Sequence, residues 1–141
     1  MKLLLDTHIW LWSLLAPDRL TPHVATVLET RTSEKWLSPI SVWETLVLAE
    51  RGRVVLEPDP ISWVRQQLVR LPFRHASLTH EVAVQSRLID LPHGDPADRF
   101  LAATARVYTL NLVFMLAFLG ASRREGEGRR HALVLGALFG A

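Results

Sequence analysis

The chain contains no cysteine, and this absence removes two classes of structure at once. Without thiols, neither a disulfide framework nor a thiolate metal site can form. A protein that needs no disulfides is compatible with a reducing compartment, and we expect a cytoplasmic location.

The chain also lacks an excess of charge of either sign. Its 16 lysine and arginine residues nearly balance its 14 aspartate and glutamate residues, which leaves a formal net charge of +2. A nucleic-acid partner therefore cannot be argued from a positive field around the whole molecule, although an RNA partner remains permitted. Internal repeats are absent as well.

Long hydrophobic runs are missing. Lys2 and the leucines after it resemble the start of a signal peptide, but Asp6 and His8 interrupt the run too early. The longest late apolar run, residues 112–121, is about half of the ~20 residues that a membrane helix needs. We therefore expect no membrane partner. With 141 residues, 49% of them hydrophobic, the chain predicts one globular domain with a substantial core.

Apolar runs and turn residues alternate along the chain in a regular order. A continuous apolar run at residues 2–5 is typical of a strand buried on both faces of a parallel sheet. Strands are predicted at residues 2–5, 35–38, 73–77 and 110–115, and helices at residues 9–15, 22–30, 42–51, 61–70 and 80–88, with a last helix that begins at residue 96. This alternation predicts the α/β class with a mostly parallel sheet.

Asp6 follows the first predicted strand directly. In open parallel sheets, ligands bind at the carboxyl ends of the strands, so the predicted fold alone gives Asp6 a functional position. The alternative is that Asp6 only caps the helix that follows. Thr7 would then either bond the Asp6 carboxylate or cap the same helix.

A second acidic stretch, HGDPADRFLAATA at residues 93–105, opens the last predicted helix. Pro96 suits the first helical position, and Asp95 suits the cap before it. Asp98 then lies in the first turn, where the helix dipole stabilises a carboxylate by about 0.3–1 kcal/mol. These residues fit a well-capped helix and a functional acid cluster equally well.

Glu44 has a structural explanation of its own. Ser41 and Glu44 have the spacing of a capping box, in which Ser41 caps the helix and the Glu44 side chain reaches back to the cap N–H. This pattern predicts that the helix begins just after Ser41.

Three motifs together resemble a known family. LLLDTHIWLW at residues 3–12, SPISVWE at residues 38–44 and LPHGDPADRFLAATA at residues 91–105 are similar to the PIN-domain fold. More narrowly, they resemble the VapC-type toxin ribonucleases of type II toxin–antitoxin pairs. The resemblance covers residues 1–113. It implies an α/β/α sandwich, an endoribonuclease that depends on Mg²⁺ or Mn²⁺, and a cognate antitoxin that occludes the site; it leaves a homodimer open.

The resemblance also implies the site residues. Asp6, Glu44 and Asp98 match the acidic positions of the family, and Asp95 belongs to a variant of the third motif as a supporting residue. Hard divalent cations prefer oxygen ligands, and Mg²⁺ uses only one or two carboxylates while it keeps several waters. Asp6 and Asp98 would hold the metal, which would activate water and neutralise the scissile phosphate. Glu44 would act through a bound water.

Two residues of the third motif have open roles. Arg99 adjoins Asp98 and would contact an RNA phosphate or form a surface salt bridge. His93 would touch RNA or orient its loop.

The resemblance ends near residue 113. The family follows its last core strand with threonine and, two residues later, an acid, whereas this chain has Phe114, Met115 and Leu116. The fourth acid is therefore missing. Residues 114–141 are rich in glycine, alanine and arginine and end in an apolar run, and we hypothesise that a reading-frame change replaced the native segment. A genuine alternative tail that binds a partner is the other interpretation.

Two other functions stay open at this point. A cleavage-impaired PIN-like protein would act only as a module that binds its antitoxin or RNA. A phosphatase or dehalogenase with Asp6 as nucleophile would need a second aspartate at the position of His8, which the sequence does not provide.

Overall fold

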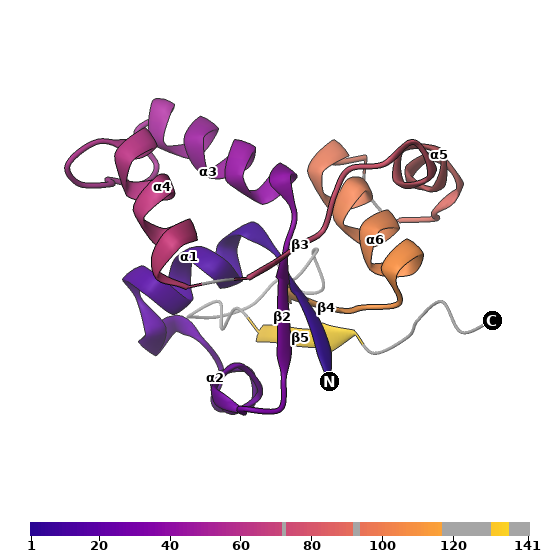
Figure 1. The fold of residues 1–141 in the computed structure, drawn as a ribbon, viewed down its shortest axis with the longest axis horizontal. Coiled ribbons are helices and arrows are strands. Elements are labelled where there is room, and N and C mark those ends of the chain that lie inside the picture. The colour runs from indigo at the N-terminus through magenta and orange to yellow at the C-terminus, as the bar shows by residue number, and fades with distance from the viewer. Residues whose placement is uncertain (72, 92–93, 117–130, 136–141) are drawn as a thin grey trace, which may run out of the picture.

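The computed structural model describes residues 1–71, 73–91, 94–116 and 131–135. Five strands and six α-helices lie in these ranges (Figure 1). The strands are β1 (Lys2–Leu5), β2 (Glu34–Leu37), β3 (Arg74–His75), β4 (Asn111–Leu116) and β5 (His131–Leu135). The helices are α1 (Thr7–Leu15), α2 (Pro22–Glu29), α3 (Pro39–Glu50), α4 (Pro60–Arg70), α5 (His80–Leu88) and α6 (Pro96–Tyr108), with a short 3₁₀ turn at Pro17–Arg19.

The strands form one sheet in the order β3-β2-β1-β4-β5. The first four strands are parallel, and β5 pairs with β4 in the antiparallel direction. Helices α1 and α2 lie on one side of the sheet and helices α5 and α6 on the other (Figure 1). The predicted α/β/α sandwich with a mostly parallel sheet is confirmed.

The alternation of side chains along β1 explains why its apolar run is continuous. Leu3 and Leu5 pack into the hydrophobic cluster on the side of α1 and α2, while Leu4 packs into the cluster that α6 covers. Successive strand residues point to opposite faces, so a strand covered on both faces must be apolar throughout. Full burial of each leucine contributes about 1.5–3 kcal/mol.

Most of the predicted helix starts are confirmed. Thr21, Thr79 and Asp95 each cap a helix through a side-chain oxygen that accepts from a backbone N–H in the first turn. Pro96 occupies the first position of α6, as the sequence predicts. In the described part of the chain, no helix combines the length and hydrophobicity that a membrane span requires.

The predicted start of α3 is wrong. The helix begins at Pro39, and Ser38 caps it by accepting from the backbone N–H of Ile40 at 3.1 Å. Proline is well suited to the first helical position because its missing N–H would have no partner there. Ser41 therefore lies inside the helix, and Glu44 cannot complete a capping box. The structural explanation for Glu44 is removed.

Strand β3 is shorter than predicted, with two residues, Arg74 and His75, in place of residues 73–77. Both side chains are exposed at the edge of the sheet, where charged side chains discourage pairing with another chain.

Candidate active site

The parallel pairing of β1 with β2 sets the geometry of the candidate site. Leu4 pairs with Trp36, so Asp6 and Ser38 follow at matching positions just beyond the two strands. Helix α1 begins directly after Asp6 and α3 directly after Ser38. Because neighbouring strands are about 4.8 Å apart, the amino ends of α1 and α3 start side by side at the carboxyl edge of the sheet.

Asp6 has a structural role at this edge. Its side chain is 8% exposed, and Oδ1 accepts a 2.7 Å hydrogen bond from the backbone N–H of Ile9, which caps α1. Its own backbone N–H donates to the Val113 carbonyl at 2.9 Å and ties the site to β4. A carboxylate has about four acceptor positions, so a capping bond and a metal bond are compatible. The cap interpretation of Asp6 is confirmed, and it fixes the position of the side chain.

The other predicted acids, Glu44 and Asp98, lie on two helices that contact each other. Glu44 is half-buried on α3, and α3 contacts both α1 and α6. Asp98 is half-buried in the first turn of α6. The carboxyl end of α6 leads to β4, and the amino end of α6 lies beside α3 (Figure 1). Asp95 Oδ1 accepts from the backbone N–H groups of Ala97 at 2.9 Å and Asp98 at 3.4 Å. Asp95 is exposed and serves as the cap that holds Asp98 in place.

A closed metal centre is not formed by these acids. Across the described ranges, no group of three histidine, aspartate or glutamate side chains gathers closely enough to hold a metal ion. Mg²⁺ does not require such a group, because it binds through only one or two carboxylates and completes its shell with water. A cation that requires three or more protein ligands would not fit the described acids.

Two buried hydroxyl groups lie in the first turns of α1 and α3. Thr7 is 1% exposed and Ser41 is fully buried, and neither hydroxyl oxygen has a hydrogen-bond partner within the described residues. The prediction that Thr7 bonds Asp6 or caps α1 is therefore wrong. Ser41 was not predicted as a site residue, although its position three residues before Glu44 puts both on one helix face. Buried polar atoms are rarely unpaired, so these two hydroxyl groups are exceptions to the usual pattern.

Arg99 has a structural role that the sequence did not predict, and its contact with an RNA phosphate stays a prediction. Its Nη1 donates to the carbonyl oxygens of Ile89 at 2.8 Å and Ser86 at 3.3 Å, at the end of α5. These bonds satisfy carbonyl groups that the last turn of a helix leaves without partners. Arg99 forms no salt bridge with another described residue, and it joins α5 to α6. His93, the other residue with an open role, lies outside the described residues.

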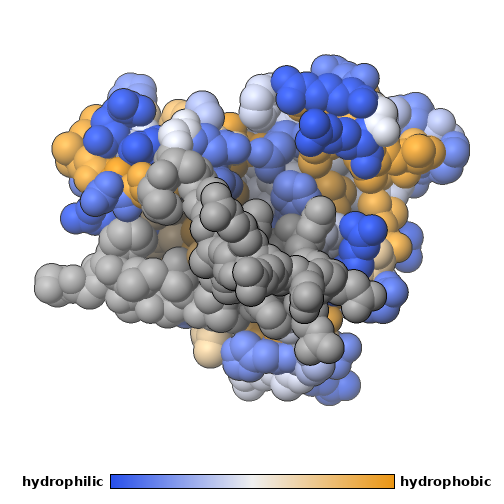
Figure 2. Space-filling view, turned by 180° about the vertical axis from the view of Figure 1, so that it is seen from behind, coloured by the Kyte–Doolittle hydropathy of each residue, from blue (hydrophilic) through white to orange (hydrophobic). Residues whose placement is uncertain are grey.

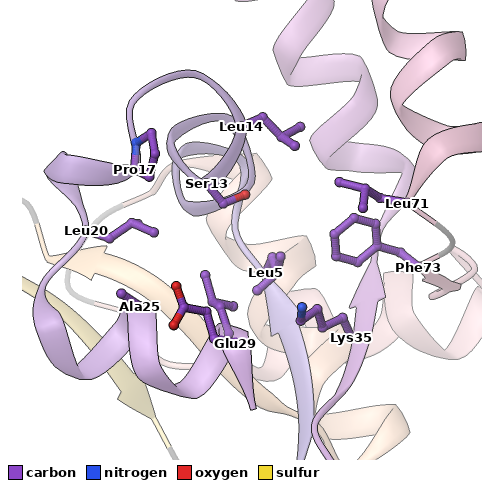
Figure 3. A pocket seen from close by; sticks show the side chains of 11 residues that line it. Leu5, Ser13, Leu14, Pro17, Leu20, Ala25, Glu29, Lys35, Leu71 and Phe73 are labelled. Carbon is purple, nitrogen blue, oxygen red and sulfur yellow. The ribbon is translucent and has the colours of Figure 1, made fainter. Parts of the chain in front are cut away.

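One cavity of the described structure is separate from the acids. A cavity of about 370 Å³ lies between the carboxyl half of α1, helix α2 and the segment before β3 (Figure 3). Apolar side chains dominate its lining, and the side chains of Glu29 and Lys35 point into it. A second hollow of about 310 Å³ shares Leu14 and Leu71 with it. None of the predicted site residues lines either hollow.

Exposed hydrophobic side chains gather over two helices at the upper corners of the face in Figure 2. The exposed residues of α4 and α5 and of the segment before α5 are Ile61, Leu68, Val69, Leu78, Val84 and Leu88. Single exposed apolar side chains are common on globular proteins, and only large contiguous apolar patches mark surfaces where other proteins bind.

Two solved structures share the fold. One is a toxin–antitoxin complex from Klebsiella pneumoniae, with a TM-score of 0.54 and 18% identity over 77% of this chain and 82% of that chain. The other is VapBC2 from Rickettsia felis bound to a DNA fragment from their promoter, with a TM-score of 0.56 and 16% identity over 79% and 85%. At these identities the likeness supports the fold alone.

The sequence comparisons are more specific. Ribonuclease VapC22 of Mycobacterium tuberculosis (strain ATCC 25618 / H37Rv) is 34% identical over 113 residues, which cover 78% of this chain and 83% of that protein. The family model of the PIN domain matches residues 3–115. This range contains β2, β3 and the six helices in full, and all of β1 and β4 except the first residue of β1 and the last residue of β4. The chain therefore belongs to the PIN-domain family.

Proposed function

We propose that this PIN-domain protein is a metal-dependent endoribonuclease toxin of a toxin–antitoxin pair. The observation that carries the proposal is the position of Asp6, fixed at the carboxyl end of β1 where α1 and α3 begin. Glu44 and Asp98 lie on α3 and on α6, which packs against α3. The relative from Mycobacterium tuberculosis, which is named a ribonuclease, supports RNA as the substrate.

Asp6 and Asp98 are the side chains that would hold Mg²⁺ or Mn²⁺. When bound, the cation would polarise a water and offset the charge of the scissile phosphate. The Ile9 N–H holds the Asp6 carboxylate in one orientation, and the Asp95 cap does the same for the first turn of α6. Glu44, half-buried on α3, would accept a hydrogen bond from the attacking water and take its proton.

An assay on total cellular RNA tests this function. Purified protein is incubated with RNA in Mg²⁺, Mn²⁺ or excess EDTA, together with the Asp98→Asn and Asp59→Asn variants. We expect slow cleavage in metal, none in EDTA, none with Asp98→Asn, and parent-like cleavage with Asp59→Asn. Asp59 caps α4 by accepting from Ser62 N–H at 2.8 Å, so it controls for the loss of a helix-capping charge. Robust cleavage in EDTA would overturn the mechanism.

The partner that we propose is a small antitoxin protein. The apolar cavity beside α1 and α2 would accept an apolar element of the antitoxin (Figure 3). A basic antitoxin side chain at the acids would replace the metal as counter-charge. Asp98→Ala should then weaken antitoxin affinity in a calorimetric titration as well as abolish cleavage. Unchanged affinity would count against a basic side chain at the acids.

A second candidate function rests on β4. Leu5 pairs with Val113, so the next residue, Phe114, lies beside Asp6 at the edge where the family has its threonine. A protein without the fourth acid would bind its antitoxin or RNA but not cleave. If the parent is inactive and the double variant Phe114→Thr, Leu116→Asp cleaves RNA in Mn²⁺, this second function is the correct one.

We also propose that residues 1–113 are the PIN-like domain and that a reading-frame change produced residues 114–141. The described part of that segment is the end of β4 together with β5, and β5 adds an antiparallel edge strand. Translation of the other two frames beyond codon 113 tests the proposal. A threonine followed two residues later by an acid should appear in one of them; its absence from both would refute the frame change.

A further inference from the structure

We propose that Trp43 binds the RNA substrate by stacking its indole ring on an unpaired base next to the scissile phosphate. The inference rests on the proposed function, because it names a residue that would hold the RNA beside the proposed acids. Trp43 would touch the substrate without taking part in bond cleavage, so it is a substrate-binding residue.

Trp43 differs from the other tryptophans of the chain in exposure and in contacts. All five tryptophans lie in the described ranges, and Trp43, on α3, is the exposed one, at 56%. The other four have aromatic neighbours: Trp10 and Trp63 pack together with ring centroids 5.8 Å apart, Trp12 lies 6.0 Å from His8, and Trp36 lies 5.6 Å from Tyr108. No ring contact joins Trp43 to another described residue. The faces of its ring are therefore available to a ligand.

The packing of α3 does not account for Trp43 either. Five other apolar residues of α3 pack against the hydrophobic clusters of the core: Ile40, Val42, Leu46, Leu48 and Ala49. Trp43 packs against neither of these clusters. Tryptophan is highly buried on average in folded proteins, so a tryptophan that the core does not use is a candidate for binding.

The contact between α3 and α6 relates Trp43 to two of the acids. Ile40 packs against the cluster that contains Leu101 of α6, and the two helices are in contact. Trp43 and Glu44 lie within one turn after Ile40 on α3, which is about 5.4 Å along the helix axis. Asp98 lies one turn before Leu101, on the same face of α6. Trp43 is therefore the sequence neighbour of one acid, with Cα atoms about 3.8 Å apart, and its helix packs against the helix of the other.

The charge balance of the protein favours RNA as the ligand of this ring. The net charge is only +2, and the phosphates of RNA have the same sign as the carboxylates of Glu44 and Asp98. Affinity for RNA at this place therefore needs a contact that does not depend on charge. Stacking of a base on an aromatic ring supplies such a contact for any base, because every base has a π-face. Bases in a duplex are already stacked, so the base must be unpaired.

Titration of fluorescently labelled RNA with the parent and three variants tests this role. The probes are oligoadenylate, oligouridylate and a duplex RNA of the same length, and anisotropy is measured in Mg²⁺ and in EDTA. Trp43→Ala removes the ring, and Trp43→Phe retains an aromatic ring. Val55→Ala is the control, because Val55 is 76% exposed and lies beyond the carboxyl end of α3.

We expect Trp43→Ala to raise the dissociation constant for the single strands about tenfold, which corresponds to about 1.4 kcal/mol. Trp43→Phe should bind within about threefold of the parent, and Val55→Ala within about twofold. Duplex RNA should bind the parent and Trp43→Ala equally. The dependence of affinity on salt should have the same slope in both proteins, because stacking releases no counterions.

Thermal unfolding and sedimentation separate substrate binding from other roles of the ring. The Tm of Trp43→Ala should match that of the parent, because the side chain is largely exposed. Parent-like affinity of Trp43→Ala for single strands would overturn this inference and leave the proposed function standing. A parent dimer that Trp43→Ala converts to a monomer would also overturn it, since a second copy would then cover the ring. Failure of the parent to bind RNA in either buffer would overturn both.

Discussion

Replacement of Asp6 distinguishes a helix cap from a metal ligand, because the structure gives the residue the first role and the proposal adds the second. Asp6→Ala removes the acceptor of a 2.7 Å bond at a position that is 8% exposed, so the Ile9 N–H loses a partner away from water. Loss of a cap costs about 0.5–2 kcal/mol, and the buried position places the expected cost near ~2 kcal/mol. For a domain of this size, that is a fall in Tm of about 8 °C.

Asp6→Asn changes the charge and retains the cap. Asparagine caps helices about as well as aspartate. The variant loses an attraction to the helix dipole of about 0.3–1 kcal/mol, but it also removes one negative charge from a region that contains Glu44 and Asp98. Without metal, we therefore expect it to be as stable as the parent or slightly more stable.

Mn²⁺ should raise the Tm of the parent but not that of Asp6→Ala or Asp6→Asn. At Mn²⁺ tenfold above the dissociation constant, binding to one site stabilises the folded state by about 1.4 kcal/mol, or about 5 °C in Tm. The assay is thermal unfolding of the parent, Asp6→Ala, Asp6→Asn and the remote cap variant Asp59→Ala, in EDTA and in Mn²⁺. Asp59→Ala should have a lower Tm than the parent, but Mn²⁺ should raise its Tm by the same amount as that of the parent. If Mn²⁺ does not change the Tm of the parent, and Asp6→Asn is less stable than the parent in EDTA, then Asp6 is purely structural.

Three further predictions follow from particular contacts. Arg99→Ala should lower the unfolding free energy by about 1.5–3 kcal/mol, because two carbonyls at the end of α5 lose a charged donor, while Mn²⁺ affinity in calorimetry should not change. The N–H of Ser62 lowers the pKa of Asp59 from its ordinary value of 3.8, so this carboxylate stabilises the fold above that pH, and the stabilisation is lost as the pH falls through the lower folded pKa. Acid unfolding of Asp59→Asn followed by circular dichroism should therefore show a weaker pH dependence below about pH 4. Finally, Ser38→Ala should lower Tm with and without metal by the same amount, since Ser38 caps α3 through the Ile40 N–H and has no role at the acids.

Much of the fold could be predicted because local rules and tertiary packing agree. The apolar run of β1 requires burial on both faces, and Leu4 and Leu5 have that burial. The Asp95-Pro96 start of α6 combines a good cap with a preferred first residue, and it forms as predicted. For α6, one start position satisfies both the capping pattern and the hydrophobic pattern, and the helix begins there.

The error at α3 had a physical cause. Ser38 and Ser41 both fit a helix cap, and the glutamate three residues after Ser41 favoured the second. The position of Pro39 decided the outcome, because a proline at the first helical position leaves no N–H without a partner. The correction matters for function, since it removes the only local structural explanation for Glu44.

The contacts between distant segments could not be predicted from the sequence. Arg99 reaches carbonyls 10 and 13 residues earlier, a contact that depends on how α5 packs against α6. The unpaired hydroxyls of Thr7 and Ser41 likewise follow from burial, which no local pattern of serine or threonine encodes. The role of His93 and the proposed boundary near residue 113 remain predictions.

The central claim is that acids at the carboxyl edge of the sheet hold a divalent cation, and anomalous X-ray scattering from crystals grown in Mn²⁺ tests it most directly. The account predicts an anomalous peak bonded to carboxylate oxygens of Asp6 and Asp98 and surrounded by waters. The peak should be absent from Asp6→Asn crystals grown under the same conditions. A peak elsewhere on the protein, or no peak at millimolar Mn²⁺, would contradict the account.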